Sequence, residues 1–165
     1  MSNKIKYMKK QQPYIIFLVD DDPVFVKALE LQLKENLKYP VDIHTFSDGE
    51  ECLKYLCLGP LIVVLDYYLN SKNPDAANGV EIMKKIKNID PLTEVIMLTR
   101  ADNMQIALEI MNNGAFNYIT KNEIVFKRFQ NIIHAVIHQK MVSDFIIETE
   151  DEDENLEKED ENALI

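Results

Sequence analysis

Short apolar runs recur along the chain, and each is followed by a segment in which apolar residues return every three or four positions. The runs cover residues 14–19, 41–46, 61–65, 94–98 and 115–119. Runs of this length are too short for helices and are rich in strand-forming residues, so they predict five β-strands. The segments with helical spacing predict one helix from residue 23 and four more over about 47–58, 79–87, 103–112 and 123–145.

Two of the helix starts carry capping signals. Asp22 stands directly before Pro23, and an aspartate at the N-cap followed by proline at the first helical position favours a helix. Ser47 and Glu50 have the spacing of a capping box, in which the serine accepts from the helix and the glutamate reaches back. These signals place helices directly after the first and second strands.

Strands and helices thus alternate five times, which is the pattern of an α/β domain. The first, third and fourth strands are apolar throughout, as expected for strands that helices cover on both faces. Right-handed crossovers between them give an open, doubly wound five-stranded parallel sheet. In such a sheet a functional site lies beyond the carboxyl ends of the strands, where the strand order reverses.

Composition agrees with one globular domain. The chain has 165 residues, of which 47% are apolar and 28% are charged. No apolar run approaches the roughly 18 residues of a membrane span, and no signal peptide follows the polar start, so we expect a cytoplasmic protein without membrane contact. Cys52 and Cys57 match no disulfide framework or zinc spacing, and we expect them to pack within a helix.

The net charge of -10 is concentrated at one end. Residues 148–165 hold ten acidic residues and one lysine, a net charge of -9, so the rest of the chain carries only -1. We therefore expect a flexible basic arm over 1–12, a folded domain over 13–147 and an acidic disordered tail over 148–165. A nearly neutral body argues against nucleic-acid binding, which needs a concentrated basic surface.

Chemically active side chains follow four of the predicted strands. Asp20 and Asp21 come after the first strand, Asp66 after the third, Thr99 after the fourth and Lys121 after the fifth. Parallel topology brings all five to one rim of the sheet. Packed carboxylates repel one another unless a proton or a cation joins them, and oxygen ligands suit Mg²⁺. A lysine and a hydroxyl on the same rim suit an anion beside the metal, so we predict a phosphoryl-transfer site.

Four strings at these strand ends resemble the receiver domain of two-component response regulators. They are Val19-Asp20-Asp21-Asp22-Pro23, Val64-Leu65-Asp66, Ile96-Met97-Leu98-Thr99 and the run from Gly114 to Lys121. The resemblance covers about residues 14–140 and implies a flavodoxin-like, CheY-like sheet with the strand order 2-1-3-4-5.

The resemblance also implies roles for individual residues. Asp66 would accept a phosphoryl group from a sensor histidine kinase or a phosphotransfer protein, and Thr99 and Lys121 would bind the phosphoryl oxygens. The domain would be a signalling protein that assists its own phosphorylation and dephosphorylation rather than an enzyme. Thr99 and Tyr118 would act as a switch that reports the phosphoryl group to the surface.

The Mg²⁺ ligands implied by the resemblance are the carboxylates of Asp20, Asp21 and Asp66 and the backbone carbonyl of Tyr68. Asp21 would bind the metal directly, and Asp20 largely through water.

Three features depart from the family pattern. Asn122 stands where many members have proline after the lysine, so the aim of Lys121 is an open question. Arg100 follows Thr99 in place of a small residue and could screen the phosphoryl group. Gly79 lies thirteen positions after Asp66, which indicates that the Asn70–Ala77 loop is enlarged.

Several functions are compatible with these residues. The leading hypothesis is a single-domain response regulator that signals through contact with a downstream protein. The alternative is a degenerate receiver that works as an adaptor without phosphorylation. An aspartate-dependent phosphatase would need an acid at position 68, where Tyr68 stands, and a flavin protein would need a phosphate loop in place of Asp20–Asp22.

Two further hypotheses concern the last helix. His134 and His138 have a spacing that can bind a metal but lack a third ligand nearby, so we expect no metal there. The apolar stripe of the helix is broader than one core-facing surface, so weak homodimerisation through the fourth helix, the fifth strand and the fifth helix is a further hypothesis.

Overall fold

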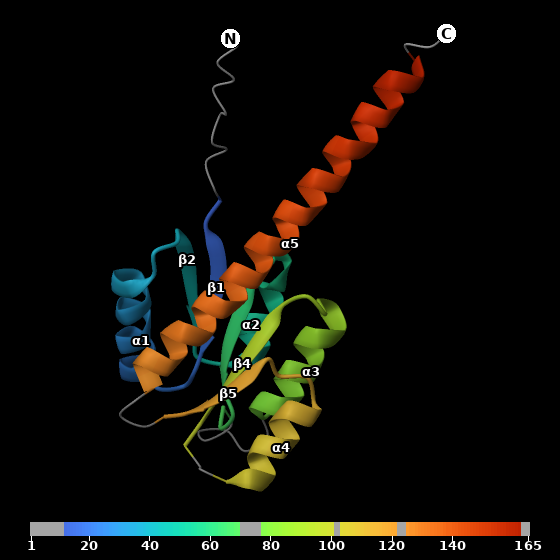
Figure 1. Cartoon of the computed structure of the whole chain (residues 1–165). Helices are drawn as coiled ribbons and strands as arrows, with labels where there is room; N and C mark the ends of the chain where they lie inside the picture. The colour runs from blue at the N-terminus through green and yellow to red at the C-terminus, as the bar shows by residue number, and fades with distance from the viewer. Residues whose placement is uncertain (1–11, 70–76, 101–102, 122–124, 163–165) are drawn as a thin grey trace.

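The computed structural model describes residues 12–69, 77–100, 103–121 and 125–162 (Figure 1). The strands are β1 (Tyr14–Val19), β2 (Val41–Phe46), β3 (Ile62–Asp66), β4 (Glu94–Thr99) and β5 (Asn117–Thr120). The helices are α1 (Pro23–Asn36), α2 (Gly49–Lys54), the 3₁₀ turn η1 (Leu56–Leu58), α3 (Gly79–Ile89), α4 (Met104–Asn112) and α5 (Val125–Asn162).

The strands form one parallel sheet in the order β2-β1-β3-β4-β5, which confirms the predicted fold class and strand order. The order reverses between β1 and β3, so a crevice opens there at the carboxyl ends. In the register of β3 and β4, Asp66 pairs with Leu98, which places Thr99 one residue further along the same rim.

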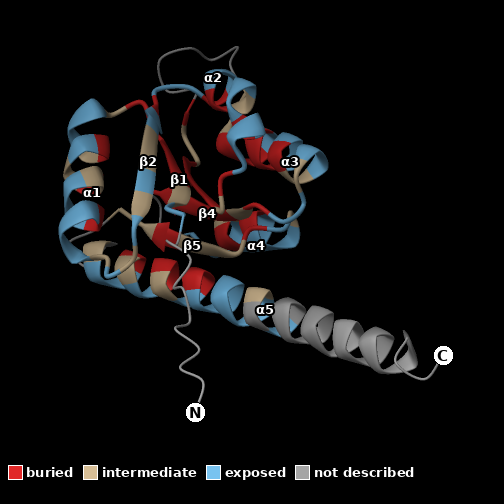
Figure 2. Ribbon diagram, turned by 90° about the horizontal axis from the view of Figure 1, so that it is seen from above, coloured by how far each residue is buried: buried red, intermediate tan, exposed pale blue. Residues whose placement is uncertain are grey.

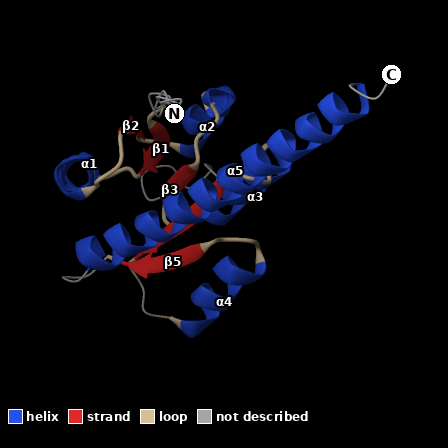
Figure 3. Ribbon diagram, turned by 45° about the horizontal axis from the view of Figure 1, so that its top comes forward, coloured by secondary structure: helices blue, strands red, loops and turns tan. Residues whose placement is uncertain are grey.

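Helices cover both faces of the sheet, as the fully apolar strands predicted (Figures 1 and 3). On one face, α1 and α5 enclose a core that includes Leu29, Phe129 and Ile133, which we call the α1–α5 core. On the other face, α2, α3 and α4 enclose the α2–α4 core, which includes Met83 and Ile110. Buried residues line the sheet and the inward sides of these helices (Figure 2).

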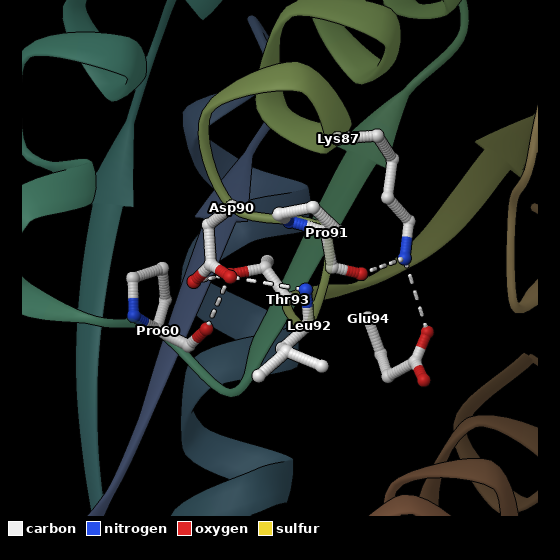
Figure 4. A network of polar contacts seen from close by, with 7 residues as sticks. All are labelled: Pro60, Lys87, Asp90, Pro91, Leu92, Thr93 and Glu94. Carbon is white, nitrogen blue, oxygen red and sulfur yellow. Dashed lines mark hydrogen bonds and ion pairs between the residues drawn. The ribbon is translucent and has the colours of Figure 1, made fainter.

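The turn between α3 and β4 is held by a polar network at the amino ends of the strands (Figure 4). Asp90 accepts a hydrogen bond from the backbone N–H of Leu92 (3.0 Å), and the buried Thr93 hydroxyl lies 2.8 Å from the Asp90 carboxylate. The same hydroxyl donates to the carbonyl of Pro60, also at 2.8 Å. This network ties the entry of β4 to the entry of β3, at the end of the sheet opposite the predicted site.

The first residues of two elements, α2 and β5, differ from the predictions. The N-cap of α2 is Asp48, whose carboxylate accepts from the Glu51 backbone at 2.7 Å, so the capping box expected from Ser47 was wrong. The strand β5 begins at Asn117 rather than at residue 115, because Ala115 is buried in the turn that precedes the ladder with β4.

The last helix is longer than the pattern predicted. Helical backbone continues from Val125 to Asn162, well beyond the sheet, through residues 148–162 that composition assigned to a disordered tail (Figure 1). Glutamate, which dominates this stretch, is among the better helix formers, so a charged segment can extend a helix that starts on a packed core. Residues 1–11 of the predicted basic arm, residues 70–76 of the Asn70–Ala77 loop, and Asn122 lie outside the described residues.

Candidate functional site

Three buried carboxylates meet at the carboxyl ends of β1 and β3. Asp20 and Asp21 directly follow β1, and Asp66 is the last residue of β3, so neighbouring parallel strands deliver all three to one rim. Their ligand oxygens lie within 4.8 Å of one another. No other group of three or more His, Cys, Asp or Glu residues among those that the structure describes has this spacing.

The neighbouring Asp22 has a separate, structural task. Its carboxylate accepts from the backbone N–H groups of Phe25 (3.1 Å) and Val24 (3.0 Å) and so caps α1. The hydrogen bond from Phe25 is the main reason why the pKa of Asp22 lies below its usual value. Asp22 also donates its own N–H to Asp20 at 3.0 Å, which orients that carboxylate. Helix capping therefore accounts for Asp22.

Asp66 is fully buried, and neither of its carboxylate oxygens accepts a well-aligned hydrogen bond from the described residues. Burial raises the pKa of this carboxyl group, and the negative charge of Asp20 raises it further, while Lys121 acts in the opposite direction. Buried carboxylate oxygens normally have partners. Three clustered carboxylates, of which Asp66 has unfilled acceptor positions, therefore fit an oxygen-binding cation such as Mg²⁺.

Lys121 forms ion pairs with two of the three carboxylates. Its ammonium Nζ is 2.5 Å from Oδ2 of Asp20 and 3.0 Å from Oδ1 of Asp66, and the side chain is almost completely buried. Nζ also lies 4.9 Å from the centroid of the Phe25 ring, within the range of a cation–π contact. The backbone N–H of Lys121 donates to the Thr99 carbonyl at 2.8 Å. These contacts direct the Lys121 side chain toward Asp20 and Asp66, although Asn122 and not proline follows the lysine.

Thr99 and Tyr68 complete the predicted rim. Thr99 is buried and ends β4, beside Asp66 on the neighbouring strand and opposite Thr120 of β5. Tyr68 lies two residues beyond Asp66, at the start of the loop that leaves the rim. Arg100, which directly follows Thr99, is exposed.

A cleft of about 540 Å³ opens beside the carboxylates. Asp20 and Asp21 form part of its wall, together with residues of α1 and of the turn between β2 and α2. Asp20 and Asp21 thus border a cleft on the side of α1, whereas Asp66 is fully buried behind them.

Gly79 is a site residue whose role the sequence left unassigned. A methyl group at this position would lie 2.3 Å from the carbonyl oxygen of Asp66 and 2.9 Å from Cα of Tyr67. The Gly79 N–H donates to the Tyr67 carbonyl at 3.1 Å. Only glycine therefore lets α3 start directly against the backbone of Asp66. The sequence feature that could have predicted this role is a glycine at the start of a helix, directly after a long loop.

Tyr118 is half-buried on β5 and packs against the α2–α4 core. The guanidinium carbon of Arg128 on α5 lies 5.9 Å from the centroid of its ring. The residue thus lies between the core under α4 and the start of α5, where a switch residue was predicted.

The remaining candidates have structural explanations. His134 packs its ring edge against Tyr39, with 5.4 Å between the centroids, and belongs to no metal-binding group among the described residues. Cys52 is buried, and burial raises the pKa of its thiol to about 12, in agreement with a packing role. Cys57 is exposed, so the packing role expected for it was wrong.

Comparison with known proteins identifies the family. The family model described as the response regulator receiver domain matches residues 16–134. The chain belongs to this family. Its members are signalling domains of two-component systems that take up phosphoryl groups, and they are not classical enzymes.

The similar proteins agree with the family. The transcriptional regulatory protein TrcR of Mycobacterium tuberculosis is 27% identical over 80% of this chain and half of its own length. The alkaline phosphatase synthesis transcriptional regulatory protein PhoP of Bacillus subtilis is 31% identical over 64% of this chain and 41% of its own length. The chain thus spans half or less of the length of these relatives.

A solved structure supports the fold. A response regulator receiver domain protein from Clostridium thermocellum superimposes with a TM-score of 0.67 at 23% identity, over 78% of this chain and 98% of that one.

Proposed function

We propose that this receiver domain accepts a phosphoryl group on Asp66 from a histidine kinase or a phosphotransfer protein, in a reaction that depends on Mg²⁺, and signals through protein contacts. The observation that supports this proposal is the buried group of Asp20, Asp21 and Asp66, with Lys121 paired to Asp20 and Asp66. The intact acidic group argues against the alternative, a degenerate adaptor that works without phosphorylation.

In the proposed reaction, a carboxylate oxygen of Asp66 attacks the phosphorus atom of a phosphohistidine. The new bond is O–P, the N–P bond breaks, and its electron pair stays on the imidazole of the donor. The phosphoryl oxygens bring further negative charge to a place that already holds three carboxylates. Catalysis is therefore mainly a matter of position and charge compensation.

The residues that would hold Mg²⁺ are Asp21 and Asp66 directly, Asp20 largely through water, and Tyr68 through its carbonyl. The bound metal supplies positive charge that offsets the repulsion between the carboxylates and the incoming group. Lys121 supplies a second positive charge, which its ion pairs with Asp20 and Asp66 already hold at the site. Its ammonium can donate to a phosphoryl oxygen once Asp66 is modified.

Thr99 and Tyr118 would carry the signal. A phosphoryl oxygen on Asp66 is a strong acceptor, so the Thr99 hydroxyl gains a charge-assisted hydrogen bond by turning toward it. This movement frees space beneath α4, and Tyr118 can occupy that space with its ring. The phosphoryl group thereby favours one of two arrangements of the surface formed by α4, β5 and α5.

Protein contacts are the proposed output. Apolar side chains are exposed along α4 at Met104, Leu108 and Met111, one or two helical turns apart, and suit a downstream protein or a weak homodimer through α4, β5 and α5. None of the helices that the structure describes is long and apolar enough to cross a membrane. We propose a cytoplasmic location and no contact with nucleic acid or membrane by this domain.

The deciding experiment is intact mass spectrometry after incubation with acetyl phosphate and Mg²⁺. The native chain should gain the mass of one phosphoryl group, and Asp66→Asn should gain none. Asp48→Asn is the matched control, because Asp48 is an exposed N-cap at which asparagine caps equally well. EDTA or Asp21→Ala should abolish the increase in mass. An equal increase in mass with and without EDTA would rule out the proposed metal site.

A further inference from the structure

The side chain that directly follows Asp66 is linked to α4. The phenol of Tyr67 donates a hydrogen bond to Oε2 of Glu109 at 3.1 Å, across 42 positions of sequence. Tyr67 is half-buried and packs against the α2–α4 core, with its ring edge-to-face on Tyr68. Glu109 lies on the exposed side of α4. The contact therefore joins the loop of the proposed phosphoacceptor to the helix of the proposed output surface.

The backbone of Tyr67 is held on two sides. Its N–H donates to the Leu98 carbonyl of β4 at 2.8 Å, and its carbonyl accepts from the N–H of Gly79 at 3.1 Å. Burial and the hydrogen bond to Glu109 raise the pKa of the Tyr67 phenol, so it keeps the proton that it donates in neutral solution. Because these hydrogen bonds tie the Tyr67 backbone to β4 and to the start of α3 rather than to α4, a displacement of α4 strains the contact between Tyr67 and Glu109.

We propose that the Tyr67–Glu109 hydrogen bond is a latch that holds α4 in the arrangement seen here and opposes its movement when Asp66 carries a phosphoryl group. This inference rests on the proposed function of Asp66 and deepens it by naming a regulatory contact. Met104, Leu108 and Met111, the exposed apolar residues of α4, move with the helix, so the latch controls how they are presented.

A contact that exists in only one of two states shifts their equilibrium by its own strength, and the effect on ligand binding is reciprocal. If the latch stabilises the unphosphorylated arrangement, its removal must tighten the binding of a phosphoryl mimic. A partly exposed hydrogen bond to a carboxylate has a net strength that corresponds to a change of roughly 3- to 10-fold.

The test is a titration of the full chain with beryllofluoride in Mg²⁺, a mimic of the phosphoryl group. Tyr67→Phe and Glu109→Ala should each lower the dissociation constant about 3- to 10-fold, and the double variant should match the single ones because both remove the same contact. Tyr55→Phe and Gln105→Ala are the matched controls, since they remove an exposed phenol elsewhere and an exposed side chain from α4. Neither control should change the affinity.

Hydrogen exchange of the α4 amides, without mimic or metal, separates the two proposals. Tyr67→Phe and Glu109→Ala should both speed exchange over residues 104–112, and the controls should not. Unchanged affinity together with unchanged exchange overturns the latch. If the native chain fails to bind beryllofluoride while the exchange result holds, the proposed function fails and the latch stands as a contact that restrains α4.

Discussion

Lys121 and Asp20 form a buried ion pair although 101 positions separate them in the sequence. The lysine follows the last strand of the sheet and the aspartate follows the first, and β3 and β4 lie between those strands. Such a pair offsets charge within the acidic group before any ligand binds. The loss of either partner leaves an uncompensated buried charge, which is costly.

Lys121→Met tests this compensation. In EDTA at neutral pH, we expect the free energy of unfolding to fall by about 3 kcal/mol, because Asp20 and Asp66 lose their cation. Addition of Mg²⁺ should recover much of the loss if the acidic group binds the metal. Urea unfolding with and without Mg²⁺ measures both effects. Lys140→Met is the control, since its ion pair with Asp144 is half-exposed and should contribute less than about 1 kcal/mol.

The raised pKa of Asp66 predicts a pH dependence of stability. A carboxyl group that holds its proton more tightly in the folded state favours folding when protonated. That contribution is complete below the ordinary pKa of about 3.9 and is lost as the pH rises through the raised value. In EDTA, the stability of the native chain relative to Asp66→Asn should therefore fall as the pH rises above about 4.

Urea unfolding at a series of pH values from about 4 upward measures the difference in the free energy of unfolding between the native chain and Asp66→Asn. We expect the difference between the native chain and the control Asp48→Asn to be independent of pH. If the difference for Asp66→Asn were also independent of pH, the environment of Asp66 would not disfavour its charged form.

Gly79→Ala tests the contact between α3 and the strand that ends in the proposed phosphoacceptor, Asp66. The added methyl group would meet the Asp66 carbonyl, so backbone must move, and we expect a loss of about 2 to 3 kcal/mol in stability and slower phosphorylation. Gly59→Ala is a suitable comparison, because its methyl group meets open space and only its positive φ of 69° adds strain. Its phosphorylation rate should match that of the native chain, and equal rates for both variants would contradict the role of Gly79.

Thr99→Ala tests the proposed switch. Without the hydroxyl, beryllofluoride should still bind, but the surface near Tyr118 and Ile106 should respond less. The NMR signals of these two residues, recorded with and without the mimic, report the response. A variant that binds the mimic and shows the full native shifts at Tyr118 would disprove this coupling route.

Local pattern was sufficient for most of the fold. The bounds of β1 and β2 were predicted correctly, because a short apolar or alternating run with breakers on both sides leaves few other conformations. Two local details failed for the same physical reason. Whether Ser47 or Asp48 caps α2, and whether Ala115 joins β5, depends on where neighbouring elements position the backbone.

The sequence alone also determined which chemistry gathers at the rim, because parallel strands carry whatever follows them to one edge. Asp20, Asp21 and Asp66 could be grouped on that basis before any distance was known.

Only the tertiary structure decided how those groups face one another. The ion pairs of Lys121 with Asp20 and Asp66 and the hydrogen bond from Tyr67 to Glu109 join residues far apart in sequence, and the close approach of Gly79 to the Asp66 carbonyl spans a loop. Their distances depend on the twist of the sheet and the packing of the helices, which no local pattern encodes.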